Sequence, residues 1–243
     1  MKNIAVIPAR FGATRFPGKL LKTIGDKTII RMVYENAIST GLFDQVLVVT
    51  DSDEIFAEIK KHGGAVKKSI AEHASGSDRI AEAINDIEVD IIVNIQGDEP
   101  FIVKKPLADL LQSFEDEKVQ VASLMKEFSS DEEIDNKNLV KVVCNAKNDA
   151  LYFSRSPIPY KRNATSSHPY FRHIGVYAFR KDTLLQFTQW PLGILENAEM
   201  LEQLRYLENG ISIRMIKTDM NTIGIDTAED LEKARLYAKN INS

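Results

Sequence analysis

Short apolar runs alternate with helical patterns over the first hundred residues. Strands are predicted at 3–7, 45–50 and 90–95, where most positions are apolar. Between them, apolar residues recur at helical spacing over 29–38 and 55–59. A weaker strand at 65–68 and a helix at 78–86 complete this half. Apolar strands joined by single helices are typical of parallel βαβ units, so we expect an α/β fold with a mostly parallel sheet and helices on both faces.

The second half has a different pattern. Strand signals crowd together, at 121–125, 140–145, 151–154 and 173–179, and helical patterning returns only at 197–208 and 228–240. We interpret the chain as one domain over residues 1–243 that contains a β-rich lobe at about 119–190. That lobe has more apolar strand signal than an edge element easily buries alone, which predicts pairing across a two-fold axis in a homodimer.

Composition then excludes several classes of protein. With 44% hydrophobic and 27% charged residues and only 12 Gly and 8 Pro, the sequence is neither collagen-like nor broadly disordered. No apolar run approaches the roughly 18 residues of a membrane helix, and Pro8 and Arg10 interrupt the first run, so we expect no signal peptide. A single cysteine excludes intrachain disulfides. A net charge of −4 argues against nucleic-acid binding, and we expect a cytoplasmic protein.

The charge is unevenly distributed, because the first 25 residues hold five basic residues and no acidic one. Most of them lie in or near the loop from Pro8 to Lys19, which follows the first predicted strand. In open α/β sheets, ligands bind beyond the carboxyl ends of strands, where backbone N–H groups and cationic side chains receive phosphates. The loop is neither a P-loop nor a dinucleotide fingerprint, because five residues separate Gly12 from Gly18 and Leu20 stands where a P-loop has Ser or Thr. A basic surface turn is the alternative.

Two aspartates each follow a short apolar run. Asp98 lies in Gln96-Gly-Asp-Glu-Pro100, and Asp226 precedes a predicted helix. Because Mg²⁺ prefers one or two carboxylates completed by phosphate oxygens and water, the pair is a candidate magnesium site. Each residue also has a structural explanation. Gly-Asp and Glu-Pro are common turn pairs, and Thr227 with Asp230 resembles a capping box, which would make Asp226 part of a helix start.

The segment His73-Ala-Ser-Gly-Ser-Asp-Arg79 is a turn of small residues before a helix. Ser75 or Ser77 is a natural N-cap there. The small residues would also let a flat base approach the backbone.

Taken together, these segments resemble the 3-deoxy-manno-octulosonate (Kdo) cytidylyltransferases, also called CMP-Kdo synthetases. The similarity extends over almost the whole chain. It is carried by Ile7-Pro-Ala-Arg10, Arg15-Phe-Pro-Gly-Lys19, Val49-Thr-Asp51, His73 to Arg79, Val93-Asn-Ile-Gln-Gly-Asp-Glu-Pro100, Ala150-Leu-Tyr-Phe-Ser-Arg155, Arg172-His-Ile-Gly-Val-Tyr177, Leu201-Glu-Gln-Leu-Arg205 and Gly224-Ile-Asp-Thr227.

This resemblance implies an enzyme that joins CTP and Kdo into CMP-Kdo and releases pyrophosphate, for lipopolysaccharide biosynthesis. It implies a Rossmann-like nucleotidyltransferase fold, dependence on Mg²⁺ and a homodimer. Catalytic roles fall on Arg10, Lys19, Asp98 and Asp226, and the two aspartates are the implied metal ligands. The implied CTP-binding residues are Pro8, Ala9, Arg10, Arg15, Lys19, Ser75, Gly76, Ser77, Arg79 and Gln96, and the implied sugar-binding residues are Arg162, His173, Tyr177, Glu202 and Gln203.

Two departures from the family pattern affect the sugar side. Many members have an Asp-Arg-Asp run where this chain has Lys161-Arg-Asn163, and Asn197 stands where some relatives have His. The CMP-8-amino-Kdo synthetases also resemble these sequences closely, so that function stays open as an alternative. A nucleotide-sugar glycosyltransferase and a non-catalytic nucleotide-binding regulator are more remote ones.

Overall fold

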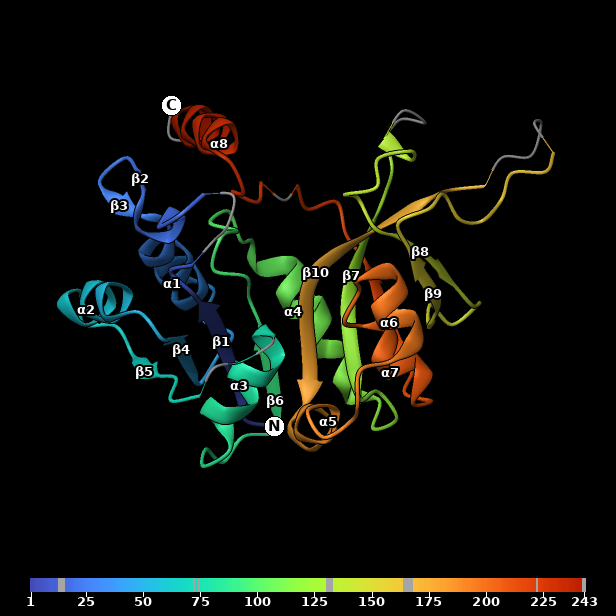
Figure 1. Cartoon of the computed structure of the whole chain (residues 1–243), viewed down its shortest axis with the longest axis horizontal. Helices are drawn as coiled ribbons and strands as arrows, with labels where there is room; N and C mark the ends of the chain where they lie inside the picture. Colours follow the sequence, from blue (N-terminus) through green and yellow to red (C-terminus); the bar gives the residue numbers. More distant parts are fainter. Residues whose placement is uncertain are drawn as a thin grey trace. The chain divides into compact units, whose positions relative to one another are not determined.

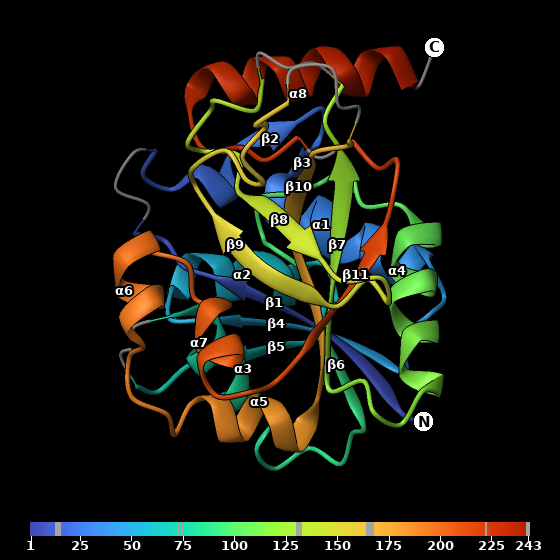
Figure 2. The same ribbon diagram turned by 90° about the vertical axis from the view of Figure 1, so that its right-hand side faces the viewer.

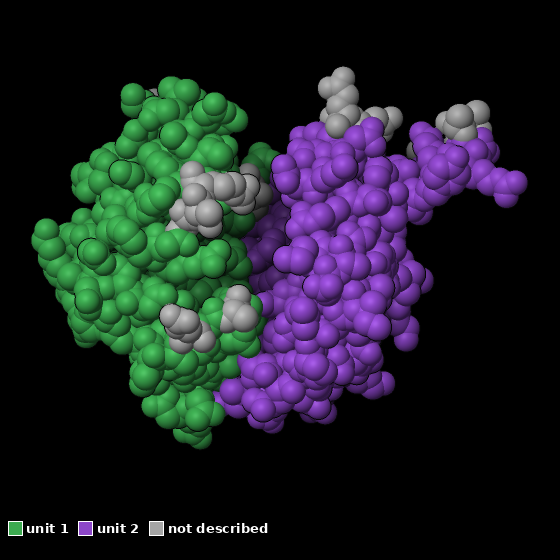
Figure 3. All heavy atoms as spheres, viewed as in Figure 1, with its two compact units in different colours: residues 1–104, 221–243 green, residues 105–220 purple. Residues whose placement is uncertain are grey.

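The computed structural model describes residues 1–12, 16–71, 73, 75–129, 133–163, 168–221 and 223–241. The chain forms two compact units, one of residues 1–104 and 221–243 and one of residues 105–220 (Figure 3). None of the described helices is long and apolar enough to cross a membrane.

The first unit is built on a parallel sheet. Strand β1 (Asn3–Ala9) pairs in parallel with β4 (Gln45–Thr50) and with β6 (Ile91–Asn94). On its far edge, β4 pairs in parallel with β5 (Val66–Lys68). The apolar runs explain this arrangement, because Ala5 to Ile7 and all of β6 are buried. Strands covered on both faces read as continuous hydrophobic sequence, as the pattern along the chain predicted.

Helices α1 (Ile29–Ser39), α2 (Asp53–Lys61), α3 (Gly76–Ile84) and α8 (Ala228–Ile241) complete this unit (Figure 1). Side-chain caps explain where three of them begin. The hydroxyls of Thr28, Ser52 and Ser75 accept hydrogen bonds from the backbone three residues further on, at the starts of α1, α2 and α3. Between β1 and α1 the chain makes a 3-10 turn (Lys19–Leu21) and the small strands β2 (Thr23–Ile24) and β3 (Lys27–Thr28).

The second unit is mixed. Strand β7 (Val121–Glu127) pairs antiparallel with β10 (Phe171–Arg180) and parallel with β11 (Ile213–Lys217). Strands β8 (Lys141–Cys144) and β9 (Ala150–Ser154) pair antiparallel with each other, and β8 also pairs with β10 (Figure 2). Its helical segments are α4 (Lys104–Gln112), the 3-10 turn Ser113–Glu115, α5 (Lys181–Phe187), α6 (Ile194–Glu199) and α7 (Leu204–Glu208).

Most of the predicted elements are present, and the predicted fold class is confirmed. Elements α4, α5, β11 and the β2–β3 pair were not predicted. The helix predicted at 197–208 is wrong as one element, because the chain forms α6 and α7 instead. Met200 separates them with a left-handed backbone, φ 52°. This conformation, which non-glycine residues rarely adopt, ends α6.

Candidate active site

Lys19 stands at the start of the 3-10 turn that follows the basic loop. The preceding Gly18 has φ 66°, a left-handed conformation that favours glycine. Its N–H donates to the carbonyl of Phe11 over 3.3 Å, so the two ends of the loop are joined across residues 13–15, which lie outside the described part of the chain. The glycine thereby turns the chain so that Lys19 points into the unit, where its side chain is only 11% exposed.

The ammonium of Lys19 lies between the two candidate aspartates. Its Nζ is 2.5 Å from Asp98 Oδ2 and 2.8 Å from Asp226 Oδ1. Burial alone would lower the pKa of Lys19, but the charges and hydrogen bonds of the two carboxylates outweigh it, so the pKa is raised. Lys19 is therefore a fixed positive charge that binds two carboxylates. They lie 79 and 207 positions further along the chain than Lys19 itself.

The predicted capping box at the start of α8 is present, but Thr227 and Asp230 form it, not the carboxylate of Asp226. Thr227 and Asp230 form the expected cap, in which Thr227 Oγ1 accepts from Asp230 N over 3.2 Å and Asp230 Oδ2 accepts from Thr227 N over 3.0 Å. The carboxylate of Asp226 lies outside this exchange and reaches Lys19. The short apolar run before Asp226 forms no strand in the described residues from 221 to 226. Instead Ile225 N donates to the carbonyl of Asp98 over 3.1 Å, which brings the two segments together.

A cavity of about 230 Å³ opens beside β1 and the start of α3. Its lining includes seven of the ten residues implied to bind CTP. Its lining consists of Pro8, Ala9, Arg10, His73, Ser75, Gly76, Arg79 and Gln96. Gly97, next to Gln96 and Asp98, packs so closely on β1 that an added Cβ would lie 3.1 Å from the carbonyl of Pro8. The aspartate site and this cavity are thus two residues apart along one segment.

Arg79 is the buried charge of this cavity. The residue is 6% exposed, and its Nη2 donates to Asp51 Oδ2 over 2.7 Å. Among the described residues, its Nη1 is buried without a hydrogen-bond partner. Because an unpaired buried donor is costly, Arg79 is a candidate for contact with a ligand in this cavity.

His73 and Glu82 form a second pair at this cavity. His73 Nε2 lies 2.5 Å from Glu82 Oε2, and the same carboxylate group accepts from Ser69 Oγ and from Ile70 N. Desolvation by itself raises the pKa of Glu82, but these hydrogen bonds outweigh it and lower the pKa to about 2. Sequence reasoning assigned no function to His73 or Glu82, because nothing in a spacing of nine residues shows that they pair.

The other candidate nucleotide residues are less tightly placed. Arg10 is exposed at the cavity rim, Ser77 is buried in the first turn of α3 outside the lining, and Arg15 lies outside the described residues.

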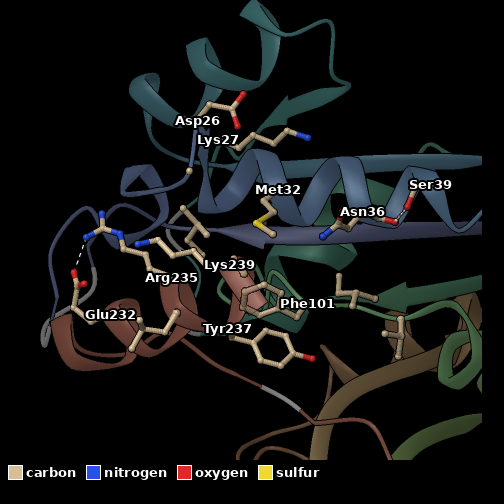
Figure 4. Close-up of a pocket in the computed structure, with 16 residues that line it drawn as sticks. Asp26, Lys27, Met32, Asn36, Ser39, Phe101, Glu232, Arg235, Tyr237 and Lys239 are labelled. Carbon is tan, nitrogen blue, oxygen red and sulfur yellow. Dashed lines mark hydrogen bonds and ion pairs between the residues drawn. The ribbon is translucent and has the colours of Figure 1, made fainter. Parts of the chain in front are cut away.

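The first unit also has a cavity of about 890 Å³ between α1, residues 101–103 and α8 (Figure 4). Several of its polar side chains have partners in the protein. Arg235 pairs with Glu232 over 2.6 Å and Asn36 donates to the carbonyl of Pro100 over 2.6 Å. The smaller cavity, with its unpaired donor, is therefore the better candidate for a polar ligand.

The implied sugar-side residues all lie in the second unit. His173 and Tyr177 on β10 have their ring centroids 5.2 Å apart, and His173 Nε2 is 2.9 Å from Ser123 Oγ. Burial lowers the pKa of His173 to about 3 and raises that of Tyr177, so both rings are neutral near pH 7. Gln203 is 6% exposed. Glu202, next to it, raises the pKa of Tyr177 further through its charge. Arg162 is exposed, and the one hydrogen bond found for it among the described residues joins its backbone to Tyr160.

Comparison with known proteins decides the family. A family model described as "Cytidylyltransferase" matches residues 4–216. A "3-deoxy-manno-octulosonate cytidylyltransferase" of Flavobacterium johnsoniae is 56% identical, and the match covers 99% of this chain and 100% of the relative. Proteins with the same name from Christiangramia forsetii (52% identity, 96% and 95% covered) and Bacteroides thetaiotaomicron (46%, 99% and 99%) are also similar. The chain belongs to the 3-deoxy-manno-octulosonate cytidylyltransferase family.

Solved structures agree with this cytidylyltransferase family. A CMP:2-keto-3-deoxy-manno-octonic acid synthetase complexed with CTP has a TM-score of 0.94 at 41% identity, over 99% of both chains. A 4-diphosphocytidyl-2C-methyl-D-erythritol synthase from Anaerococcus prevotii has a TM-score of 0.66 at 12% identity, over 98% of both chains, and shares the fold alone. The resemblance read from the sequence motifs is confirmed, and the family is one of nucleotidyltransferase enzymes.

Proposed function

We propose that this protein catalyses the reaction of CTP with Kdo to CMP-Kdo and pyrophosphate. The geometry that carries the proposal is Lys19 between Asp98 and Asp226, two residues along the chain from a cavity with a buried unpaired donor. Cation and carboxylates together suit a phosphate chain and its metal ion, and the cavity suits a nucleobase. Family membership supplies the identity of both substrates. Supply of CMP-Kdo for lipopolysaccharide biosynthesis is the corresponding cellular function.

In this reaction the anomeric hydroxyl of Kdo attacks the α-phosphorus of CTP and pyrophosphate leaves. The bond formed joins sugar oxygen to phosphorus, and the bond broken joins the α-phosphorus to the bridging oxygen. Arg10 and Lys19 donate hydrogen bonds to phosphate oxygens and so stabilise the charge of the leaving group. Pro8 to Arg10 and the start of α3 hold the nucleoside. Because CTP is then fixed beside the bound sugar, the attack becomes effectively unimolecular.

The two aspartates fit Mg²⁺. A cation already lies between them, the ammonium of Lys19. No cluster of three or more His, Cys, Asp or Glu that could hold a metal occurs among the described residues. Two carboxylates nevertheless suffice, because Mg²⁺ keeps several waters and takes phosphate oxygens from the substrate. When bound, the ion supplies charge neutralisation on the phosphoryl oxygens and acidifies a coordinated hydroxyl.

On the sugar side, we propose that His173, Tyr177, Glu202, Gln203 and Arg162 bind Kdo. The neutral side chains of His173 and Tyr177 can form hydrogen bonds with the hydroxyl groups of the sugar without attracting phosphate. Arg162, although exposed, is the cation in this set that suits the sugar carboxylate.

We also propose a cytoplasmic homodimer. The sequence predicted a dimer because the β-rich lobe has many apolar strand residues. That reason is weak, because the chain itself buries Val121, Leu124, Val142, Phe153 and Ile174. A better reason is a group of large apolar side chains in the second unit that stay exposed, Leu151, Leu192, Ile194, Leu195 and Met200. A second copy of the chain would cover them, and sedimentation showing a monomer at micromolar concentration would contradict the dimer.

Pyrophosphate release with CTP, Mg²⁺ and a panel of sugar acids tests the function. We expect turnover with Kdo. Preference for UTP, or turnover with sialic acids alone, would contradict the proposal. A kcat/KM that clearly favours 8-amino-Kdo would instead identify the protein as a CMP-8-amino-Kdo synthetase.

A further inference from the structure

Glu196 of α6 and Arg205 of α7 form a buried ion pair in the second unit. Arg205 Nε donates to Glu196 Oε2 and Arg205 Nη2 donates to Glu196 Oε1, each over 2.6 Å. Two parallel hydrogen bonds between a guanidinium and a carboxylate determine the orientation of the two groups as well as their distance. The guanidinium also lies over the ring of Phe187, 4.3 Å from its centroid. The pair therefore has a fixed geometry.

The two helices are also joined at the start of α6 and the end of α7 (Figure 2). Glu208, the last residue of α7, accepts hydrogen bonds from Leu195 N over 3.0 Å and from Glu196 N over 3.3 Å. Gly193 permits this approach, because an added Cβ would overlap the carboxylate of Glu208. Helices α6 and α7 thus form a hairpin that polar contacts hold together at both ends.

The connection between the two helices carries Glu202 and Gln203, for which we propose sugar binding. Its backbone is bonded to both members of the ion pair. Leu201 N donates to the carbonyl of Glu196 over 3.2 Å, and Arg205 N donates to the carbonyl of Glu202 over 3.1 Å. A change in the ion pair is therefore expected to move the backbone that places Glu202 and Gln203.

A stack of aromatic rings joins α7 to β10, the strand of the other buried sugar-side residues. The ring centroid of Tyr206, the neighbour of Arg205, is 5.8 Å from that of Phe179, which is 5.6 Å from that of Tyr177. The charge of Glu202 contributes to the raised pKa of Tyr177, so its carboxylate lies close enough to act on the phenol. The position of the hairpin on β10 therefore determines how Glu202 faces Tyr177.

We propose that Glu196 and Arg205 are positioning residues for the sugar acid, which hold Glu202 and Gln203 at β10 through the backbone of residues 201–203. A buried ion pair is often no more stabilising than an apolar pair of similar volume, so stability alone does not account for it. Its directional hydrogen bonds supply a defined geometry, which a binding site requires of the residues that support it. This inference rests on the proposed function, in that Glu202 and Gln203 are taken to bind Kdo.

The test is steady-state pyrophosphate release by the full-length protein, with Kdo varied at saturating CTP and CTP varied at saturating Kdo. The variants are Arg205→Lys, Glu196→Gln and the double variant Glu196→Met/Arg205→Met. Lysine keeps the charge but loses the paired hydrogen bonds. The double variant leaves no buried charge unpaired, so it should fold even if a single variant does not. We expect the KM for Kdo to rise about 10-fold in each folded variant, with the KM for CTP unchanged.

Arg214→Lys is the matched control, because Arg214 pairs with Asp149 over 2.7 Å in the same unit but on β11. It should leave the KM for Kdo unchanged. An unchanged KM for Kdo in the folded variants of the pair, or an equal rise for both substrates, would overturn the inference. A pair that only stabilises the fold changes Tm and the amount of folded enzyme, and not the KM for one substrate. A wild type that releases no pyrophosphate with Kdo would instead contradict the proposed function.

Discussion

The two units use polar side chains in opposite ways. In the first, charged groups neutralise one another and stay partly accessible, with the side chains of Asp98 and Asp226 28% and 50% exposed. In the second, His173 and Tyr177 are half-buried and neutral. Accessible charges can exchange their partners for a phosphate chain and a metal ion, whereas neutral groups can only choose among hydrogen-bonding ligands. This difference supports the proposal that the first unit carries the residues for phosphoryl transfer and that the second unit carries the residues that recognise the sugar.

The largest effect is expected at the two aspartates. Asp98→Asn and Asp226→Asn keep the side-chain size but lose the charge that holds Lys19 and the metal ion. We expect each change to lower kcat/KM about 10²- to 10³-fold or more, with little change in Tm. Asp109→Asn is the matched control, because among the described residues Asp109 pairs with Lys105 alone, on the surface of α4. A fully active Asp226→Asn enzyme would contradict a catalytic role and would leave Asp226 with a structural role at the start of α8.

Lys19→Met sharpens the same side of the comparison. It should lower kcat/KM about 10²-fold through loss of a donor to the leaving group. It should also strengthen binding of Mn²⁺ alone, measured by electron paramagnetic resonance, because two carboxylates are left without their internal cation. Lys22→Met, an exposed change three residues away, should alter neither quantity. Metal binding that is equal in wild type and Lys19→Met would contradict competition between ammonium and metal.

The pH dependence of stability separates the units. The pKa of His173 is about 3 in the folded chain and about 6.5 in the unfolded chain, so between these values the unfolded chain binds more protons. Its contribution to the free energy of unfolding is therefore present above pH 6.5 and lost as the pH falls toward 3. Glu82 contributes in a lower pH window, between its ordinary pKa of 4.5 and its folded pKa of about 2. We expect His173→Asn to reduce the fall in Tm between pH 7 and pH 5, measured by thermal unfolding at both pH values.

The smallest expected effect distinguishes capping from chemistry. Thr227→Ala removes the hydroxyl that accepts from Asp230 N at the start of α8. It should cost about 1 kcal/mol of stability, measured by denaturant unfolding, and leave kcat/KM within a few-fold of wild type. A loss of activity comparable to that of Asp226→Asn would mean that the cap and the carboxylate cannot be separated.

Sequence alone could predict the elements with strong periodicity, and it missed those that depend on tertiary contacts. Continuous apolar runs identified β1, β4 and β6, whereas α4 was missed although Leu107 and Leu110 on it are buried. The helix expected at 197–208 breaks at a left-handed residue, Met200, whose side chain gives no such signal.

The candidate site was predictable in its residues and not in its connections. Gly and basic residues after a strand identified the loop, and acidic residues after apolar runs identified Asp98 and Asp226. The position of Lys19 between them depends on the turn at Gly18 and on the bond from Ile225 to Asp98, which no periodicity encodes. The pairing of His73 with Glu82 likewise required the folded turn before α3.

The central claim is that Asp98 and Asp226 act as one unit, and the double variant Asp98→Asn/Asp226→Asn tests it most directly. The measurement is kcat/KM for CMP-Kdo formation in the wild type, both single variants and the double variant. Groups that share one function are non-additive. We therefore expect the double variant to be little worse than either single one. Losses that multiply would contradict it, because they would show two aspartates with separate tasks.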